Sequence, residues 1–233
     1  MVNVIAHRGA SRARRENTVE AFEYAVELGA DGVELDVRLT ADRALVIHHD
    51  ARIEGGGSIA TMTSQELPSH VPSLPEALDA CSPLMVNVEI KNSARSRYYD
   101  RDMVTVSGVA TVLAGRADGP FTISSFDLAT VDAARDQLPM IPTAHLVDRG
   151  DSTRLLRRAL AHGHRIIHPD DLLVDEVFMA QARQLGMEVN VWTVDDPTRM
   201  AELIDLGIDG IITNVPDIAR VAVAGVGTAT PDD

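Results

Sequence analysis

Residues 18–39 read TVEAFEYAVELGADGVELDVRL, and this stretch decides the fold class. Residues 18–28 have the apolar spacing of an amphipathic helix, whereas residues 32–39 have the β-branched residues and the alternation of a strand. Gly29 stands where the helix ends, and glycine takes the left-handed conformation of that position without a Cβ clash. The stretch therefore predicts a helix that leads directly into a strand, which is the repeating unit of a parallel sheet.

The same alternation continues along the whole chain. Gly186 and Gly207 repeat the helix-ending glycine before two later strands. About eight such units in 233 residues predict an α/β protein with a (β/α)8 TIM barrel, and an open doubly wound sheet is the next-best architecture. A G-x-G-x-x-G fingerprint would favour the open sheet, but HRGAS follows the first strand at residues 7–11. The predicted strands are 2–6, 32–39, 44–48, 85–90, 121–124, 141–147, 165–167, 188–194 and 210–213, and the predicted helices are 18–28, 74–80, 100–113, 128–137, 152–162, 174–185 and 197–206.

A single catalytic domain is predicted over residues 1–221. Residues 51–73 contain three glycines followed by Ser, Thr, Pro and His, which predicts a short irregular excursion over the barrel rim. We interpret this excursion as a reduced insertion after the second βα region. Residues 222–233 are small and rich in Gly, Thr and Pro, and we expect them to form a flexible C-terminal tail.

The composition excludes several classes of protein. With 35 acidic and 21 basic residues the formal net charge is −14, so the long-range field repels nucleic acid and anionic membrane surfaces. One Trp, three Tyr and four Phe are too few for base-stacking platforms. Cys81 has no second cysteine to pair with, and no apolar run approaches the roughly 20 residues that span a bilayer. We therefore expect a cytoplasmic protein with no stable membrane anchor, in an oligomeric state that the sequence leaves open.

Three carboxylates stand where a buried strand should be apolar. Glu34 and Asp36 lie two apart in VELDV, so both point to one face of the strand, and Glu89 with Lys91 repeats the pattern in VEIK. Ion pairs with arginines on helices are the alternative for any one of these carboxylates. Three of them together are costly without a cation, and a set of oxygen ligands without cysteine favours Mg²⁺ or Ca²⁺ over zinc.

Histidines and basic residues stand at the ends of the predicted strands. His7 and Arg8 end the first strand, and His49 follows the strand predicted at 44–48. In a barrel the loops after the strands build the active site, where two imidazoles suit a general acid and a general base. Arg8 and Lys91 are suited to bind the non-bridging oxygens of a phosphate. A structural role is the alternative for either histidine alone, and we assign that role to His48, which strand alternation turns to the opposite side.

Motifs of one known family also run through the chain in the family's order. The segments are HRGA at 7–10, ENT at 16–18, GADGVELDV at 29–37, HD at 49–50, EIK at 89–91, SSF at 124–126, VWTV at 191–194 and DGIITN at 209–214. They resemble the glycerophosphodiester phosphodiesterase family. The resemblance implies a TIM barrel, a divalent metal held by Glu34, Asp36 and Glu89, His7 and His49 as the acid/base pair, and Arg8 and Lys91 at the phosphate.

The chain departs from the family pattern after His49. Many members carry a leucine-x-Arg-Thr-Thr segment there and a longer insertion that helps to enclose the glycerol end, whereas this chain has ARIEGGG at residues 51–57. The resemblance therefore supports the reaction class more strongly than the substrate.

The resulting expectation is metal-dependent hydrolysis of glycerophosphodiesters, a class of small molecules, to sn-glycerol 3-phosphate and an alcohol. Mg²⁺ or Ca²⁺ is the expected ion, with Mn²⁺ as a third candidate, and Trp192 is expected to pack over the glycerol or the alcohol. The sequence leaves open which histidine is the acid and whether a cyclic phosphate forms. The alternatives are a phosphodiesterase similar to lysophospholipase D or sphingomyelinase D, and a non-catalytic phosphate-binding barrel.

Overall fold

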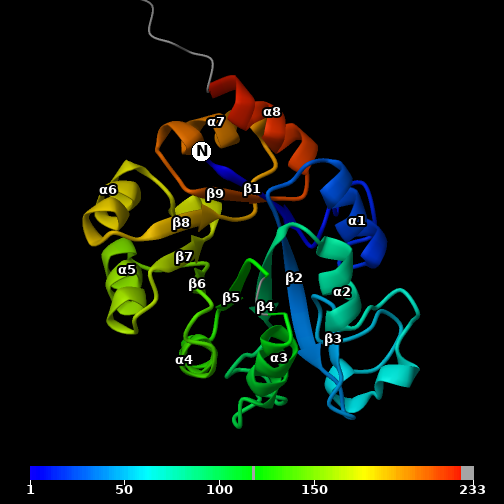
Figure 1. Ribbon diagram of the computed structural model, residues 1–233. Coiled ribbons are helices and arrows are strands. Elements are labelled where there is room, and N and C mark those ends of the chain that lie inside the picture. The colour runs from blue at the N-terminus through cyan, green and yellow to red at the C-terminus, as the bar shows by residue number, and fades with distance from the viewer. Residues whose placement is uncertain (117–118, 227–233) are drawn as a thin grey trace, which may run out of the picture.

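The computed structural model describes residues 1–116 and 119–226. Within these ranges eight parallel strands form one sheet that closes on itself, and helices alternate with the strands along the chain (Figure 1). β1 pairs with both β2 and β9, and this double pairing closes the barrel. The (β/α)8 barrel is thereby confirmed, and the open sheet is excluded. The barrel strands are β1 (Asn3–His7), β2 (Gly32–Leu39), β4 (Met85–Ile90), β5 (Phe121–Ser125), β6 (Thr143–Val147), β7 (Ile166–Pro169), β8 (Glu188–Val191) and β9 (Gly210–Thr213).

The helices form the outer layer of the barrel (Figure 1). Several begin at an aspartate whose carboxylate accepts an N–H of the first turn, as Asp127 does from Thr130 and Asp151 does from Arg154. These caps lie at the carboxyl ends of the strands. Some of the many acidic residues therefore cap helix N-termini at that rim. The helices are α1 (Val19–Glu27), α2 (Leu74–Cys81), α3 (Val104–Ala114), α4 (Leu128–Gln137), α5 (Ser152–Ala161), α6 (Glu176–Leu185), α7 (Pro197–Asp205) and α8 (Pro216–Val226).

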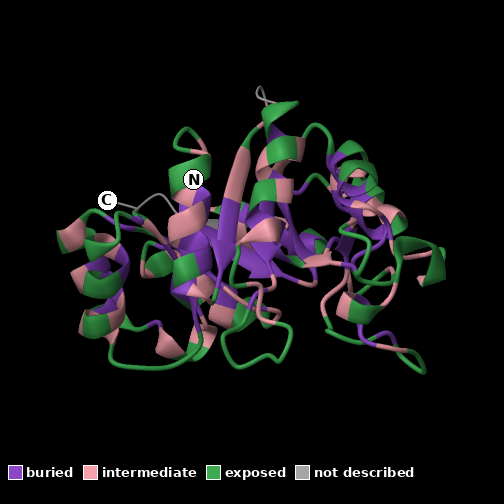
Figure 2. Ribbon diagram, turned by 90° about the horizontal axis from the view of Figure 1, so that it is seen from below, coloured by how far each residue is buried: buried purple, intermediate pink, exposed green. Residues whose placement is uncertain are grey.

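The layer between sheet and helices is apolar. Val33, Leu35 and Val37 of β2 are fully buried there, in one cluster with residues of α1 and α2. Figure 2 shows the buried strands at the centre and the exposed residues on the outer helices. Because side chains alternate along a strand, Glu34 and Asp36 of β2 point into the barrel instead. The strand that builds the core therefore also delivers two carboxylates to the interior.

Some predicted boundaries shift. The helix predicted from residue 100 begins at Val104, because Asp100 stays outside it and its carboxylate accepts the N–H groups of Val104 and Thr105 at 3.1 and 2.7 Å. The strand predicted at 141–147 begins at Thr143, and the one predicted at 188–194 ends at Val191. Gly29 follows α1 in the left-handed conformation that the sequence predicts, with φ of +70°.

The excursion after β2 has its own small core. β3 (Leu45–Ile47) pairs antiparallel with β2 and lies outside the closed ring of parallel strands. The chain then forms two short 3₁₀ helices, η1 (Ile59–Thr61) and η2 (Ser64–Glu66), and a third, η3 (Asp171–Leu173), follows β7. Val46, Ile53 and Ile59 pack together beneath the excursion. Residues 51–73 are thus held by apolar contacts over one part of the barrel rim.

The last helix is absent from the sequence prediction. α8 packs with Ala219 buried, and Arg220 forms an ion pair of 2.8 Å with Asp31 in the loop before β2. This helix includes residues 222–226, which belong to the segment expected as a flexible tail. Residues 227–233 of that segment lie outside the described residues.

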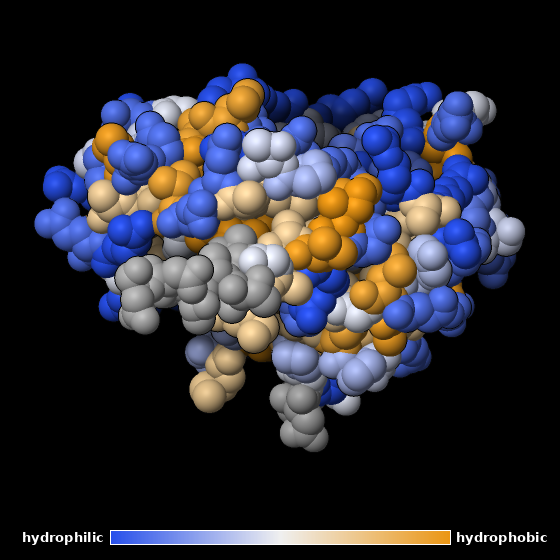
Figure 3. Space-filling view, turned by 90° about the horizontal axis from the view of Figure 1, so that it is seen from above, coloured by the Kyte–Doolittle hydropathy of each residue, from blue (hydrophilic) through white to orange (hydrophobic). Residues whose placement is uncertain are grey.

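No helix in the described part of the chain is long and apolar enough to cross a membrane. On the side shown in Figure 3, hydrophobic residues lie in separate groups among hydrophilic ones. Two of the most exposed large hydrophobic side chains, Met140 and Leu172, lie on different parts of the fold, one between α4 and β6 and the other in η3.

Candidate active site

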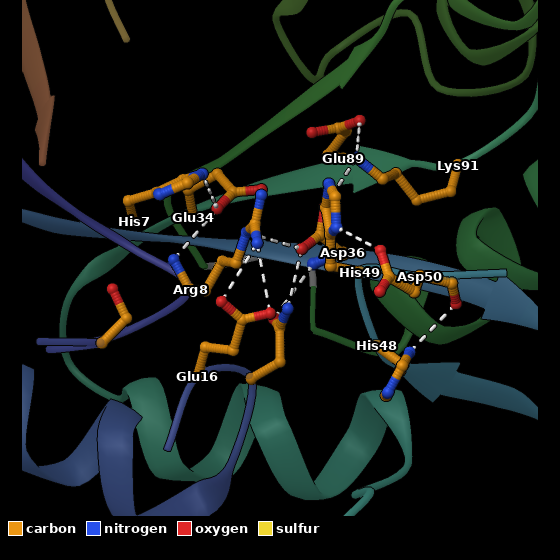
Figure 4. A network of polar contacts seen from close by, with 12 residues as sticks. His7, Arg8, Glu16, Glu34, Asp36, His48, His49, Asp50, Glu89 and Lys91 are labelled. Carbon is orange, nitrogen blue, oxygen red and sulfur yellow. Dashed lines mark hydrogen bonds and ion pairs between the residues drawn. The ribbon is translucent and has the colours of Figure 1, made fainter. Parts of the chain in front are cut away.

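Three buried carboxylates meet at the ends of β2 and β4. Glu34, Asp36 and Glu89 each offer one oxygen, and these oxygens lie within 4.8 Å of one another. The strand register explains the meeting, because Asp36 pairs with Glu89 across the parallel strands and Glu34 lies two residues earlier on the same face. Figure 4 shows the three side chains converging, with basic side chains between them.

Two cations hold this cluster together. The Lys91 Nζ lies 3.0 Å from Asp36 Oδ1 and 2.7 Å from Glu89 Oε1. The Arg8 Nε lies 3.3 Å from Asp36 Oδ2, and its other end pairs with Glu16 at 3.0 Å. Two cations therefore face three buried carboxylates, and one of them, Arg8, also pairs with Glu16. The cluster is therefore short of positive charge.

The pKa values show which carboxylates lack nearby positive charge. Burial raises the pKa of Glu34 well above its usual value, and Asp36 and Glu89 add to the shift. Burial also raises the pKa of Glu89 to about 7, although Lys91 opposes it. Burial acts to raise the pKa of Asp36 too, but Lys91 and Arg8 outweigh it and that pKa falls well below its usual range. Glu34 and Glu89 are thus the two carboxylates that lack compensation.

The donor set fits a hard divalent cation. Glu34 Oε1 is buried and has no hydrogen-bond partner among the described residues, so the carboxylate that most needs positive charge has an oxygen free to supply to an ion. All three ligand groups are carboxylates, which suit Mg²⁺ and Ca²⁺. Glu34, Asp36 and Glu89 can therefore hold a divalent ion, as the sequence analysis expects.

His7 is held in one tautomer. Its Nδ1 lies 2.8 Å from Oδ1 of Asn214, which follows β9. The amide nitrogen of Asn214 donates to Asp195 at 2.7 Å, and Ser11 donates to the same Oδ1 at 2.8 Å, so this oxygen faces His7 as an acceptor. His7 must then carry its proton on Nδ1. The unprotonated Nε2 lies 3.9 Å from Glu34 Oε2, beside the carboxylates.

The environment also keeps His7 neutral. Burial, followed by the positive charge of Arg8, lowers the pKa of His7 to about 4. A neutral imidazole with a bare Nε2 at the edge of the carboxylate cluster can accept a proton.

His49 approaches from the loop after β3. Its Nδ1 lies 2.9 Å from Asp50 Oδ1, and burial followed by Lys91 lowers its pKa. Figure 4 places His7 beside Glu34 and His49 beside Asp36, whereas His48 points away from the carboxylates. The Nδ1 of His48 contacts the backbone oxygen of Asp50 at 2.9 Å. The structure thus brings His7 and His49 to the cluster and leaves His48 outside it.

Known proteins are similar to this chain in sequence and in fold. The model of the glycerophosphoryl diester phosphodiesterase family matches residues 7–218, a range that contains every site residue described above. The chain belongs to this family. A glycerophosphodiester phosphodiesterase of Caldanaerobacter subterraneus is 29% identical, and the match covers 92% of this chain and 94% of that one. The protein is therefore an enzyme, a phosphodiesterase of the glycerophosphodiester class.

Two further relatives extend the comparison. A lysophospholipase D of Rattus norvegicus is 24% identical, over 91% of this phosphodiesterase and 83% of the relative. The structure of an Oleispira antarctica phosphodiesterase in complex with the product sn-glycerol-3-phosphate has a TM-score of 0.88. It is 24% identical and covers 95% of this chain and 96% of its own, so the likeness is one of fold.

Two cavities of this phosphodiesterase open beside the carboxylates. The first, of about 410 Å³, has Glu89, Lys91 and Phe126 among its walls, and the second, of about 1030 Å³, has Glu16 and His49. A substrate phosphate at the cations would have space on both sides.

Trp192 occupies a supporting position. Its Nε1 donates to the backbone oxygen of His168 at 2.8 Å, and its ring meets Phe126 edge-on with centroids 5.4 Å apart. Trp192 lines neither of the two cavities, whereas Phe126 lines the first. The substrate contact of Trp192 stays a prediction, and what the structure adds is that Trp192 braces Phe126.

Several residues of the site are missing from the sequence prediction. Asn17 donates to Asp36 Oδ2 at 2.7 Å, and Arg38 donates to the backbone oxygens of His48 and His49. Arg38 had a readable signal, because it lies two residues after Asp36 on the same strand face. Asn214 had no signal beyond its place in the DGIITN segment, and Asp195, which follows the VWTV segment, had none.

Replacing Asn214 with alanine is expected to lower kcat by about tenfold to a hundredfold with little change in KM, because His7 loses the acceptor that fixes its tautomer. Steady-state kinetics on a glycerophosphodiester would measure the effect. Asn3→Ala is the matched control, since Asn3 is exposed at the other end of the barrel. A kcat equal to that of the control would show that Asn214 does not position His7.

Metal affinity is expected to fall as the pH falls from 8 to 6. An ion needs ionised ligands, and the pKa of Glu89, raised to about 7, means that a proton competes for this ligand across the range. The raised pKa of Glu34 acts in the same direction. The dissociation constant should rise by up to about tenfold per pH unit for each competing proton. Calorimetric titration with Mg²⁺, Ca²⁺ and Mn²⁺ at several pH values would test this, and an affinity independent of pH would contradict it.

Proposed function

We propose that this enzyme is a metal-dependent phosphodiesterase that hydrolyses glycerophosphodiesters to sn-glycerol 3-phosphate and an alcohol. The observation that carries the proposal is the buried carboxylate triad enclosed by Arg8 and Lys91. When all three carboxylates are ionised, three negative charges face two positive ones, and such a site without metal would repel a phosphodiester. A bound divalent ion leaves one positive charge, which the single negative charge of a phosphodiester balances.

Glu34, Asp36 and Glu89 would hold the ion. When bound, the ion would act as a Lewis acid that polarises a phosphoryl oxygen. Arg8 and Lys91 bind the other phosphoryl oxygens and stabilise the charge that builds up on them in the transition state. Both side chains are already held in place, Arg8 by Glu16 and Asp36, and Lys91 by Asp36 and Glu89. Little reorganisation is needed when the substrate arrives.

The histidines divide the proton transfers. His7 has a bare Nε2 and a neutral acceptor at Nδ1, so it accepts the proton of the attacking oxygen. His49 has the Asp50 carboxylate at Nδ1, which favours the protonated ring against the lowering of its pKa by burial and Lys91, so we assign to it the proton donated to the departing alkoxide. The attacking oxygen is either water or the glycerol 2-hydroxyl, and the second route would pass through a cyclic phosphate.

The known relatives support the substrate class. The relative from Caldanaerobacter subterraneus bears the name of this activity, and the Oleispira antarctica structure holds sn-glycerol 3-phosphate as its product. The first cavity has polar side chains such as Ser93 and Ser96 and apolar ones such as Ile59, so it suits an alcohol with both polar and apolar parts.

The test is release of sn-glycerol 3-phosphate from glycerophosphocholine, glycerophosphoethanolamine and glycerophosphoglycerol, each with Mg²⁺, Ca²⁺, Mn²⁺ or EDTA. Turnover that EDTA abolishes and that metal restores is the expected result. Exclusive turnover of lysophosphatidylcholine would move the assignment to a lysophospholipase D. Product analysis in ¹⁸O-labelled water would show whether a cyclic phosphate precedes hydrolysis.

A further inference from the structure

The first cavity leads away from the phosphate-binding cations. Its walls are the ends of β2 and β4, the excursion after β3, and the loop of residues 92–100 after β4. Glu89 and Lys91 form its inner end, and Tyr98, with 40% of its surface exposed, lies on its outer wall. A substituent on a phosphate bound at Lys91 therefore has a path along this cavity to solvent.

One wall contains a cation without a counter-ion. Arg38 is half-buried, and its Nε donates to the backbone oxygens of His48 and His49 at 3.1 and 3.0 Å. No carboxylate of the described residues forms an ion pair with it. Burial lowers the pKa of Arg38, although Asp36, Glu89 and Asp50 oppose this from farther away. The Arg38 Nη2 also donates to the backbone oxygen of His49, but a guanidinium has five N–H donors, so others remain for a ligand in the cavity.

The acidic residues of the same cavity are already engaged. Glu89 pairs with Lys91 at 2.7 Å. The Asp100 carboxylate accepts the N–H of Val104 at 3.1 Å and both the N–H and the hydroxyl of Thr105 at 2.7 Å. Among the described residues that line the cavity, Arg38 is therefore the charged side chain with neither an ion pair nor a helix terminus to cap, and its guanidinium is available to an occupant.

A second cation lies next to the outer wall, behind Tyr98, and does not itself line the cavity. The Arg97 guanidinium lies over the Tyr98 ring, 4.9 Å from its centroid, and no ion pair with a described carboxylate holds it. Arg101 of the same loop lies instead over Tyr99, 5.8 Å from its centroid, and neither residue lines the cavity. Arg97 therefore stacks on a residue that lines the cavity, whereas Arg101 stacks on one that does not.

We propose that this cavity binds the alcohol part of the substrate and selects alcohols that carry an anionic group, either a carboxylate or a second phosphate. The inference rests on the proposed function. An anionic group would pair with Arg38 inside the cavity, and Arg97 would add a positive charge beyond the Tyr98 ring. A quaternary ammonium group would instead set a positive charge against a half-buried guanidinium, which is unfavourable.

Glycerophosphoserine and glycerophosphoethanolamine give a direct test, because they differ by one carboxylate. The ratio of their kcat/KM values is expected to favour the serine ester by about tenfold or more, the effect of one charge-assisted contact. Glycerophosphoglycerol and its terminal phosphate ester give a second pair. The larger of the two ratios would show whether a carboxylate or a phosphate is preferred.

Variants separate the cavity from the catalytic residues. Arg38→Gln is expected to bring the serine-to-ethanolamine ratio close to one, and Arg97→Gln to lower it about threefold. Arg38 also holds the backbone that carries His49, so its loss would slow both reactions, but the ratio cancels that common effect. Arg101→Gln is the matched control and should keep both the rate and the ratio of the parent enzyme.

Two failures are distinguishable. Hydrolysis of glycerophosphoethanolamine with a parent ratio at or below one, or with a ratio that Arg38→Gln leaves unchanged, would overturn the selection of anionic alcohols and leave the proposed function intact. Failure to hydrolyse any of the four esters in the presence of metal would overturn the proposed function and this inference with it.

Discussion

The His7→Ala enzyme is expected to lose about a thousandfold in kcat while KM stays within a factor of about three. His7 presents an unprotonated Nε2 at the edge of the carboxylate cluster, and its Nδ1 is occupied by Asn214 at 2.8 Å. No other described imidazole approaches Glu34 in this way, because His49 lies on the Asp36 side of the cluster. Removing the imidazole should therefore remove proton transfer from the attacking oxygen and leave the phosphate-binding cations in place.

His48→Ala is the matched control for this loss. His48 is a histidine on the same rim, but it points away from the carboxylates (Figure 4). Steady-state kinetics of both variants, with metal at saturation, would measure the difference. A His7→Ala enzyme as active as the His48→Ala enzyme would contradict the assignment of His7 as the base. Equal inactivity of both would point instead to damage to the rim.

The second large effect concerns Glu34→Gln. This variant is expected to weaken metal binding by about a hundredfold or more and to lower activity in parallel. The same change should make the metal-free protein more stable by about 2 kcal/mol at pH 8, because it removes a buried carboxylate that has too little positive charge around it. The substitution would then raise the stability of the metal-free protein and lower the activity. General misfolding would lower both.

The pH dependence gives the sign of the stability effect. The pKa of Glu34 rises from a usual value of 4.5 on folding, so above pH 4.5 the unfolded chain releases a proton that the folded chain keeps. The penalty therefore grows as the pH rises from 4.5 toward the folded-state pKa, and the advantage of Glu34→Gln grows with it. Thermal unfolding without metal at pH 5 and pH 8 would measure this trend.

Thermal unfolding with and without metal supplies the readout that is independent of activity. The parent enzyme should gain stability on adding metal, by about 2.7 kcal/mol at a concentration one hundred times the dissociation constant, and Glu34→Gln should gain little. Glu23→Gln, on the exposed face of α1, is the control. A Glu34→Gln protein with the full metal-induced gain would show that the ion binds elsewhere.

Local sequence patterns account for the carboxylates of the site. The spacing of Glu34 and Asp36 places both on one strand face, and the parallel pairing of β2 with β4 brings Glu89 beside Asp36. Glycines such as Gly29 marked the ends of helices for the same local reason. A TIM barrel and its catalytic rim follow from such patterns, since they depend on neighbours a few positions apart.

Contacts across the closed barrel were beyond reach of those patterns. His7 and Asn214 are 207 positions apart, and they meet because β1 pairs with β9 in one particular register. Arg38 could be placed on the inner face by alternation, but its lack of a carboxylate partner appears only when the neighbouring elements are packed. α8 was missed because its small residues resemble a tail, although Ala219 and Arg220 anchor it to the barrel.

The alternation of β2 also links catalysis to the fidelity of folding. A slip of β2 by one residue against β4 would turn Glu34 and Asp36 toward the helices and bring Val33 and Leu35 into the interior. Such a molecule would lose its ligands and its core in the same movement. The register of β2 against β4 is therefore one condition for both metal binding and stability, and a change that shifts it would lose both together.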